Sequence, residues 1–345
     1  MRITVASDAG FASIFDRMDG PLSSSDPSVQ AQNDAPHVAS ALRSLGHEVS
    51  TAVLGAKATQ DLAAVAGAGE ALVDAAPDLV VNLCDSVQGE PRLAPLVPAF
   101  LDAHGLRHTG GDAGATALGK RKHDVKAVLV REGLPTPCYQ VIDVDADVAS
   151  FELKLVPPVI LKLCGEHASV GIDPTSVCFD EDAVRAKALS LQHRYGQPIL
   201  VEEYVAGREF YVSCIGRPLR PWPLMEHQLS EGLPIRTFDR KWLERDVDVP
   251  LRDRAPGSIP QRASAAPFAG SLDDVGALCA RALHVIGWQD WGRVDLRLDK
   301  GGIPLIIDVT PMTYLHPEAP CAKAASAAGC SYVELWRRIV DGATC

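Results

Sequence analysis

The first hundred residues alternate between short apolar runs and amphipathic segments. Residues 2–6 (RITVA) have the composition of a strand, and residues 36–46 carry Val38, Leu42 and Leu45 at helical spacing before a terminating glycine. The same reading predicts a strand at 47–55, a mostly apolar strand at 77–84 and a helix at 94–105. Because strands and helices alternate, this part of the chain is predicted to be α/β with a small parallel sheet.

A glycine-rich break at residues 107–115 (RHTGGDAGA) separates this part from the rest of the chain. Beyond it the pattern predicts a helix at about 115–132, strands near 137–143 and 158–163, a loop, another strand, a helix near 181–195, a hairpin at 198–216, a helix at 272–286, a second hairpin at 291–310 and a final helix. Residues 217–261 are rich in proline, arginine and aspartate and have little periodicity. Such a segment favours an active-site lid over a simple spacer.

Composition limits the class of protein. The 345 residues correspond to about two or three domains. A net charge of −11 disfavours binding to nucleic acid or an anionic membrane. The N-terminus does not resemble a signal peptide, and no apolar run approaches the roughly 20 residues of a membrane helix, so we expect a cytoplasmic protein. The nine cysteines include no CxxC pair, and reduced cysteines are favoured over disulfides or a zinc site.

The hairpin at 291–310 carries the strongest chemical signal. In its first strand, apolar positions alternate with charged ones: Val294, Leu296 and Leu298 against Arg293, Asp295 and Arg297. In its second strand, apolar positions alternate with polar ones: Leu305, Ile307 and Val309 against Asp308 and Thr310. Symmetric pairing around the DKGG turn predicts Asp295 opposite Ile306 and Asp308 opposite Arg293. The two acids are then diagonal neighbours, and a shared Mg²⁺ is favoured over the alternative, an Arg293–Asp308 salt bridge.

Two lysines lie where apolar side chains are expected. Lys122 follows Leu118 by four residues on the predicted helix, and Lys162 ends the apolar strand PPVIL. Each lysine either snorkels to solvent or binds an anion. The small residues after Lys162 (CGEHAS) favour a loop that folds over a phosphate, although one glycine alone is a weak signal.

Two glutamates flank the turn in VEEYVAGREF. Glu202 and Glu209 are either polar residues at strand ends or acceptors for the amine and ribose hydroxyls of a nucleoside. The sequence does not separate these alternatives.

Taken together, these segments resemble the ATP-grasp superfamily, and within it the D-alanine–D-alanine ligase-like branch. The resemblance covers roughly residues 76 to 340 and preserves the order of the family's motifs. The similar segments are the helix entry HTGGDAGATALGKRKHDVKAVLVREGLPTP, the phosphate-loop strand PVILKLCGEHASVGI, the hinge ILVEEYVAGREF, the lid motif FDRKW, the metal hairpin WGRVDLRLDKGGIPLIIDVTP and the closing helix AAGCSYVELWRRIV.

The resemblance implies an α/β protein with an ATP-grasp fold, in which ATP lies between two antiparallel sheets. It implies an N-terminal parallel α/β domain at 1–108, a central subdomain with the phosphate loop at 109–201 and a C-terminal subdomain with the lid and metal hairpin at 202–345. The implied nucleotide ligands are Lys122, Lys162, Glu202, Tyr204, Val205 and Glu209. The implied catalytic residues are Arg293, Ser169 and Lys241, and the implied Mg²⁺ ligands are Asp295, Asp308 and Thr310.

Several positions depart from the family pattern. The family's usual EVNPNP motif is DVTPMT here, so a hydroxyl from Thr310 replaces an amide and Asp308 is one methylene shorter. His167 and Ala168 replace a glycine and a serine of the phosphate loop. Tyr314 replaces a glycine near the oxyanion site, and Ala319 replaces the serine that binds the acceptor's carboxylate. The glycine-rich N-terminal motif is not recognisable in SDAGFASIFD.

These departures predict a substrate other than D-alanine. The leading hypothesis is an ADP-forming ligase that joins a small carboxylate to an amine through an acyl phosphate, in specialised metabolism. The alternatives are an ATP-dependent cyclisation or phosphorylation, and a degenerate protein that binds nucleotide with little turnover. The predicted partners are ATP, Mg²⁺, and small carboxylate and amine substrates. Because family relatives are often dimeric through the N-terminal domain, a homodimer is also an expectation of the resemblance.

Overall fold

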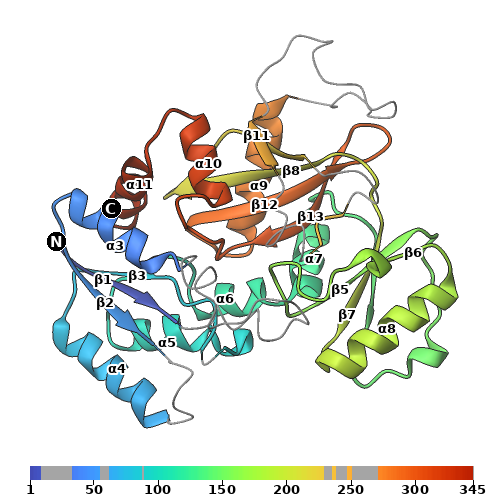
Figure 1. Ribbon diagram of the computed structural model, residues 1–345, viewed down its shortest axis with the longest axis horizontal. Coiled ribbons are helices and arrows are strands. Elements are labelled where there is room, and N and C mark those ends of the chain that lie inside the picture. Colours follow the sequence, from blue (N-terminus) through green and yellow to red (C-terminus); the bar gives the residue numbers. More distant parts are fainter. Residues whose placement is uncertain are drawn as a thin grey trace.

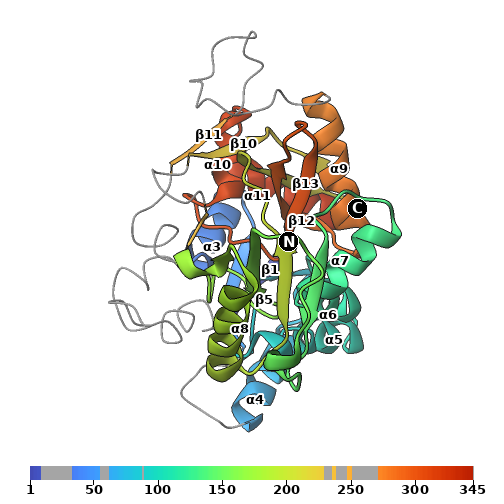
Figure 2. The same ribbon diagram turned by 90° about the vertical axis from the view of Figure 1, so that its right-hand side faces the viewer.

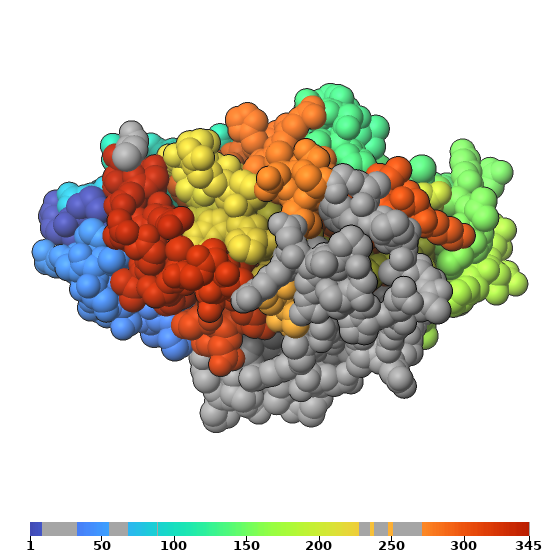
Figure 3. All heavy atoms as spheres, turned by 90° about the horizontal axis from the view of Figure 1, so that it is seen from above, coloured from blue at the N-terminus to red at the C-terminus, as the bar shows by residue number. Residues whose placement is uncertain are grey.

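A computed structural model describes residues 1–8, 33–54, 62–87, 89–228, 235–237, 247–250 and 271–344. The described chain forms three sheets (Figure 1). In Figure 1 the N-terminal sheet and the central sheet lie at opposite ends of the molecule, with the C-terminal sheet between and above them. Seen from above in the space-filling view of Figure 3, the yellow, orange and red C-terminal residues again lie between the blue N-terminal and yellow-green central residues.

The N-terminal sheet is parallel, with strand order β2-β1-β3, as the alternation of strands and helices predicts. Its strands are β1 (Arg2–Ser7), β2 (Glu48–Val53) and β3 (Leu79–Asn82), and its helices are α3 (Ala35–Ser44), α4 (Leu62–Ala75) and α5 (Leu96–Ala103), with a short 3₁₀ turn at Pro91–Leu93. Helix α4 is not among the predicted elements. The sheet shares one apolar core with the C-terminal helix α11 (Tyr332–Thr344), through residues such as Val38, Leu42 and Trp336.

The central sheet is antiparallel, with strand order β4-β7-β5-β6. Its strands are β4 (Tyr139–Ile142), β5 (Val159–Leu163), β6 (Val177–Cys178) and β7 (Ile199–Glu203), and 3₁₀ turns lie at Val148–Ser150 and Pro174–Ser176. Helix α8 (Glu181–Tyr195) covers one face. It begins at Asp180, whose side chain accepts from Ala183 N, and ends at Gly196 in the left-handed conformation. The apolar core between α8 and the sheet belongs to this unit alone.

The C-terminal sheet has the order β11-β10-β8-β12-β13, with β9 paired to β8. Its strands are β8 (Glu209–Gly216), β9 (Arg220–Pro221), β10 (Met225–Gln228), β11 (Val247–Pro250), β12 (Asp290–Leu298) and β13 (Pro304–Thr310). Figure 2 shows α7 (Lys122–Arg131) and α9 (Leu272–Val285) on one side of this sheet and α10 (Pro320–Ala327) and α11 on the other. Strands β9, β10 and β11 come from the segment at 217–261 that was predicted to lack regular structure.

The predicted hairpin at 198–216 is wrong. Strand β7 pairs in the central sheet and β8 pairs in the C-terminal sheet, so the segment between them crosses from one sheet to the other. At Gly207 this crossing passes so close to β12 that an added Cβ would lie 1.9 Å from Leu298 O. A side chain does not fit there, so the glycine that suggests a turn instead permits close approach of two backbones.

The predicted single helix at 115–132 is interrupted. It consists of α6 (Ala113–Gly119) and α7, with Lys120 and Arg121 between them. The interruption frees the backbone N–H of Lys122, which donates to Cys164 O at 2.9 Å, at the end of β5. A contact to the end of the central sheet therefore replaces an internal helical hydrogen bond.

Asp290 joins the start of β12 to the break after the N-terminal sheet. Its carboxylate is fully buried and accepts from Gly110 N at 2.7 Å and from Arg217 Nε at 2.8 Å. Its φ of 66° is left-handed, a conformation that aspartate and asparagine tolerate better than most residues.

We expect Asp290→Ala to lower the free energy of unfolding by roughly 3 kcal/mol, because Arg217 and Gly110 N lose their buried acceptor. Asp290→Asn keeps the backbone preference and one acceptor oxygen, so it should lose less. Urea unfolding measures both. Equal stability of the wild type and Asp290→Ala would contradict this role.

Candidate active site

A pocket of about 700 Å³ lies between the central and C-terminal sheets. Its lining includes β5 and the loop after it, the end of β7, the polar face of β12, the end of β13, and α10. Eleven of the twelve residues predicted as ligands or catalytic groups line this pocket: Lys122, Lys162, Ser169, Glu202, Tyr204, Val205, Glu209, Arg293, Asp295, Asp308 and Thr310. Lys241 lies outside the described residues.

Glu202, at the end of β7, binds two lysines. Its Oε1 accepts from Lys126 Nζ at 2.7 Å and its Oε2 accepts from Lys162 Nζ at 2.9 Å. Burial raises the pKa of Glu202, but the two lysines outweigh burial and hold it below its ordinary value. Burial opposes the charge of Lys162 as well, and Glu202 outweighs it, so the pKa of Lys162 is raised. Both groups are therefore charged at neutral pH.

Lys126 is a site residue that the sequence analysis missed. It follows Lys122 by four residues and lies on the same face of α7, and this spacing is the signal that was available. Its ammonium also donates to Thr136 Oγ1 at 2.6 Å, and that hydroxyl donates to Ile306 O at 2.7 Å. Lys126 does not line the pocket. It holds the Glu202 carboxylate in position from α7.

The charged face of β12 points into the pocket, as its alternation predicts. Val294, Leu296 and Leu298 lie in the apolar core on the other face. Arg293 Nη2 donates to Asp295 Oδ2 at 2.8 Å. Arg297 donates through Nε and Nη2 to Glu209 Oε2 and through Nη1 to Val205 O. Arg297 thus orients two of the predicted nucleotide ligands and is a second site residue that the prediction missed.

The predicted register of the metal hairpin is wrong. Near the turn, Leu296 pairs with Ile306, which is already one residue away from the predicted register. A bulge at Ile307 then inserts one more residue into β13, so Asp295 pairs directly with Asp308 and Arg293 pairs with Thr310. The bulge also corrects the predicted alternation. Ile306 and Val309 lie in the core, whereas Ile307 lines the pocket beside Asp308 and Thr310.

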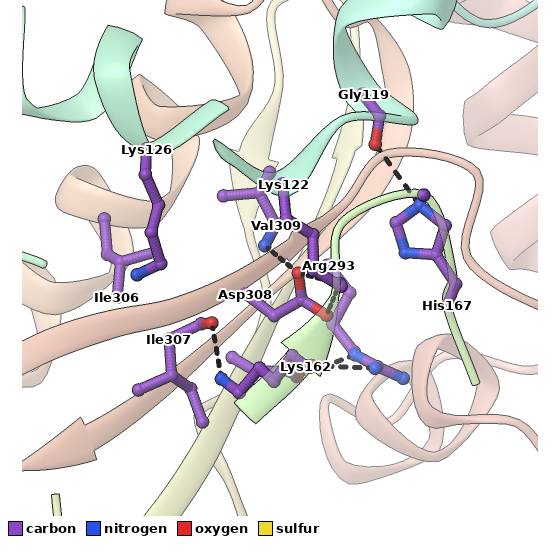
Figure 4. Close-up of polar contacts among 12 residues, drawn as sticks. Gly119, Lys122, Lys126, Lys162, His167, Arg293, Ile306, Ile307, Asp308 and Val309 are labelled. Atoms are coloured by element: carbon purple, nitrogen blue, oxygen red, sulfur yellow. Dashed lines mark hydrogen bonds and ion pairs between the residues drawn. The ribbon is translucent and has the colours of Figure 1, made fainter. Parts of the chain in front are cut away.

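The bulge supplies carbonyl oxygens to the site. Lys162 Nζ lies 3.3 Å from Ile307 O, a contact that Figure 4 shows beside the Asp308 carboxylate. Asp308 accepts from Lys122 Nζ at 2.6 and 2.7 Å. Burial raises the pKa of Asp308, but Lys122 and neighbouring groups hold it well below its usual range. Lys122 and Asp308 therefore join the first turn of α7 to the end of β13.

The loop after β5 folds over this cluster. Ala168 and Ser169 both have positive φ, at 59° and 65°, which is strained for residues other than glycine. His167 Nε2 lies 3.2 Å from Gly119 O (Figure 4), and burial holds the pKa of the imidazole well below its ordinary value. His167 is therefore neutral and joins the loop to the end of α6. This contact gives His167 a packing role between the loop and α6.

The donor set fits a nucleoside triphosphate with Mg²⁺. Two lysines and Arg293 suit phosphate oxygens, and the directly paired acids Asp295 and Asp308 offer carboxylate oxygens to one divalent cation. Among the described residues, no group of three or more His, Cys, Asp or Glu side chains is arranged to hold a metal. Two carboxylates suit Mg²⁺, which commonly completes its shell with water and phosphate oxygens.

Comparisons with known proteins agree with this fold. The D-alanine–D-alanine ligase of Bacillus anthracis, solved as a complex with ATP, has a TM-score of 0.72 at 18% identity, over 99% of this chain and 97% of that chain. Such a likeness defines the fold as ATP-grasp. The family described as "D-ala D-ala ligase C-terminus" matches residues 128–341. The chain therefore belongs to the D-alanine–D-alanine ligase family.

Curated relatives span most of the chain. Uncharacterized protein y4sG of Sinorhizobium fredii (strain NBRC 101917 / NGR234) is 27% identical over 99% of this chain and 96% of that protein. The D-alanine–D-alanine ligase of Bordetella avium is 28% identical over 72% of this chain and 74% of its own length. ATP and Mg²⁺ are the cofactors of this family. No helix in the described part of the chain is long and apolar enough to cross a membrane.

We expect Lys126→Met to lower the free energy of unfolding by roughly 3 kcal/mol, because the buried Glu202 then has one cation instead of two. Adding Glu202→Gln removes the unbalanced charge and should restore part of the loss. Urea unfolding measures both variants. As a control, Arg337→Ala removes an exposed pair with Glu334 and should leave the free energy of unfolding nearly unchanged. An equal effect of the buried and exposed changes would contradict the account.

Stability should also depend on pH through Glu209. Burial raises its pKa, but Arg297 outweighs burial and lowers it from 4.5 to about 2. Ionised Glu209 therefore stabilises the fold fully above about pH 4.5, and the effect is lost as the pH falls toward 2. The wild type should exceed Glu209→Gln in unfolding free energy at pH 7, and this difference should shrink below about pH 4.5 and disappear as the pH approaches 2. A difference that stays constant over this range would refute this assignment.

Proposed function

We propose that the protein is an ATP-dependent, ADP-forming carboxylate–amine ligase that acts on small amino-acid-like substrates other than D-alanine. The observation that supports this most directly is that Lys162 from one sheet and Arg293, Asp295 and Asp308 from the other line a single pocket. Triphosphate and carboxylate substrates need such a concentration of cations, with acids for a metal. The named ligases among its relatives support the same reaction class.

In this proposal the nucleotide lies between the sheets. Lys122 and Lys162 bind its phosphates, and the carboxylates of Glu202 and Glu209, with the backbone of Tyr204 and Val205, bind adenine and ribose. Asp295, Asp308 and Thr310 hold Mg²⁺, which when bound neutralises charge on the phosphates. Lys122 is directly paired with Asp308. In this proposal the Asp308 carboxylate is therefore shared between the Lys122 ammonium and the metal.

The reaction proceeds in two substitutions, the first at the γ-phosphorus of ATP and the second at the acyl carbon of the activated substrate. A carboxylate oxygen attacks the γ-phosphorus of ATP, the bond to the β–γ bridging oxygen breaks, and ADP leaves with an acyl phosphate formed. A neutral amine then attacks the acyl carbon. The carbon–oxygen bond to phosphate breaks, and the amine's proton passes to the medium. Arg293 stabilises the negative charge that develops on the carbonyl oxygen.

In this proposal, loops of the protein exclude water from the acyl phosphate. Residues 166–170 of the loop after β5 line the pocket, and Ser169 is proposed to face the reacting groups. Lys241, outside the described residues, is proposed to reach the γ-phosphate from the lid. The domain boundaries at 108 and 201, like the homodimer, remain proposals carried by the family resemblance.

Two pocket residues argue against D-alanine. Ala319 precedes α10 and provides no side-chain cap, where D-alanine–D-alanine ligases have a serine that binds the acceptor. Tyr314 lines the pocket in place of a glycine, and its ring stacks on His316 with centroids 5.6 Å apart. The acceptor end therefore differs in both shape and polarity from one built for D-alanine.

The proposal is tested by ADP release with Mg·ATP across a panel of amino acids and dipeptides, each product being identified by mass. We expect ADP to appear only with particular substrate pairs, together with a condensed mass. Arg293→Met should lower the rate at least 100-fold, because the developing oxyanion loses its charged donor. Release of ADP with loss of water from a single substrate would support cyclisation instead. Efficient use of D-alanine would contradict the substrate class.

A further inference from the structure

One end of the pocket carries a charged cluster that takes no part in nucleotide binding as proposed above. This end is formed by one face of α10, by β11 and by the short segment at 235–237. The α10 face presents, at positions spaced by three and four residues, Ala319, Ala322, Lys323 and Ser326. Three of these side chains are small, so Lys323 is the charged group that α10 offers to the pocket.

Lys323 is held in place by a buried carboxylate. Its Nζ donates to Asp248 Oδ2 at 2.8 Å, across the gap between α10 and β11. The Asp248 side chain is 1% exposed, whereas that of Lys323 is 39% exposed. An ammonium has three donors, and Asp248 accepts one of them. Lys323 is thus fixed at its tip and still open to the pocket.

Two further residues complete the cluster from behind. His227, opposite Asp248 on β10, shares a hydrogen bond of 2.5 Å between its Nδ1 and Asp248 Oδ1. Arg236 Nη1 lies 3.0 Å from His227 Nε2. Because the guanidinium is only a donor, Nε2 accepts, and Nδ1 must carry the proton that is donated to Asp248. Burial and Arg236 lower the pKa of His227, in agreement with a neutral ring.

The cluster holds Lys323 at a fixed position. One oxygen of Asp248 binds Lys323 and the other binds His227, whose second ring nitrogen accepts from Arg236. A lysine that only neutralised a surface acid would not require a buried imidazole and guanidinium behind that acid. The arrangement instead holds a cation at a defined point of the wall, which favours a bound anion.

The cluster lies next to the proposed reacting centre. The Tyr211 ring lies between the two, with its centroid 5.8 Å from the Arg293 guanidinium carbon and 4.7 Å from the His227 ring centroid. A substrate whose amine reaches the acyl carbon beside Arg293 can therefore extend toward Lys323. The small side chains of α10 leave room for it.

We propose that Lys323, positioned by the Asp248–His227–Arg236 chain, is the anion-binding group of the amine-acceptor subsite, and that the acceptor carries a carboxylate that this ammonium binds. This inference rests on the proposed ligase function and names the class of its second substrate. Lys323 determines specificity, and Asp248 and His227 position it.

The test pairs each amine acceptor with its own carboxamide, so that only the anionic group differs. Acceptors that give ADP and a condensed product with the wild type are measured again with Lys323→Met. For the carboxylate form, KM should rise at least tenfold. For the carboxamide, KM should be the same within twofold in both proteins, because the ammonium then has no anion to bind. The KM for ATP should not change.

Three variants control for folding and for loss of any lysine. Lys323→Met with Asp248→Asn removes the unpaired buried acid and should show the same acceptor defect with a restored melting temperature. Lys323→Arg keeps the charge and should recover most of the affinity. Lys187→Met removes a lysine that pairs with Asp173 at the same 2.8 Å but outside the pocket, and it should leave the acceptor KM unchanged.

The outcomes separate the two proposals. An equal KM for carboxylate acceptors in the wild type and Lys323→Met, with ligation intact, would overturn the role of Lys323 alone. Preference of the wild type for the carboxamides would do the same. Absence of ADP release with every acceptor, while Mg·ATP still binds, would overturn the ligase function itself and with it this inference.

Discussion

The structure depends on a buried carboxylate that binds two ammonium groups. Glu202 ends a strand of the central sheet, Lys162 ends the neighbouring strand, and Lys126 comes from a helix that packs against the C-terminal sheet. A buried charge is costly unless it is paired, so these three groups hold one another in position. The contact joins the two walls of the pocket at the point where a phosphate is expected to bind.

This junction is important because the sheets differ in how they are attached. The N-terminal and C-terminal parts share one apolar core, whereas the central sheet and α8 have a core of their own. Polar contacts therefore carry much of the attachment of the central sheet. The bulge at Ile307 contributes to it, since carbonyl oxygens released from regular pairing bind Lys162 and Thr136. β-Bulges often occur next to functional sites, where they redirect protein groups toward the site.

Much of the fold was predictable, and so was the meeting of the proposed nucleotide and metal ligands in one pocket, because both follow from local periodicity and from motifs in a characteristic order. The alternation in β12 placed Arg293, Asp295 and Arg297 on one face. The errors arose where a distant contact decides the local structure. Gly207 permits a crossing between sheets instead of a turn, and the N–H of Lys122 bonds to β5 instead of continuing a helix.

The chain of residues behind Lys323 was beyond prediction for the same reason. Its residues come from α10, β10, β11 and the segment at 235–237. The spacing of residues within one element does not predict contacts between four different elements. Sequence motifs predicted the residues at the proposed nucleotide end of the pocket, whereas the proposed acceptor end emerges only from the three-dimensional arrangement. Two of the departures from the family pattern, Tyr314 and Ala319, lie at this proposed acceptor end.

The central claim is that cations from both sheets jointly bind a triphosphate. Titration calorimetry of Mg·ATP into the wild type and into Lys162→Met tests it most directly, with the fold of both proteins checked by circular dichroism. The account predicts measurable heat for the wild type and at least tenfold weaker binding for the variant. A folded wild type that gives no heat with saturating Mg·ATP, or a variant with unchanged affinity, would contradict it.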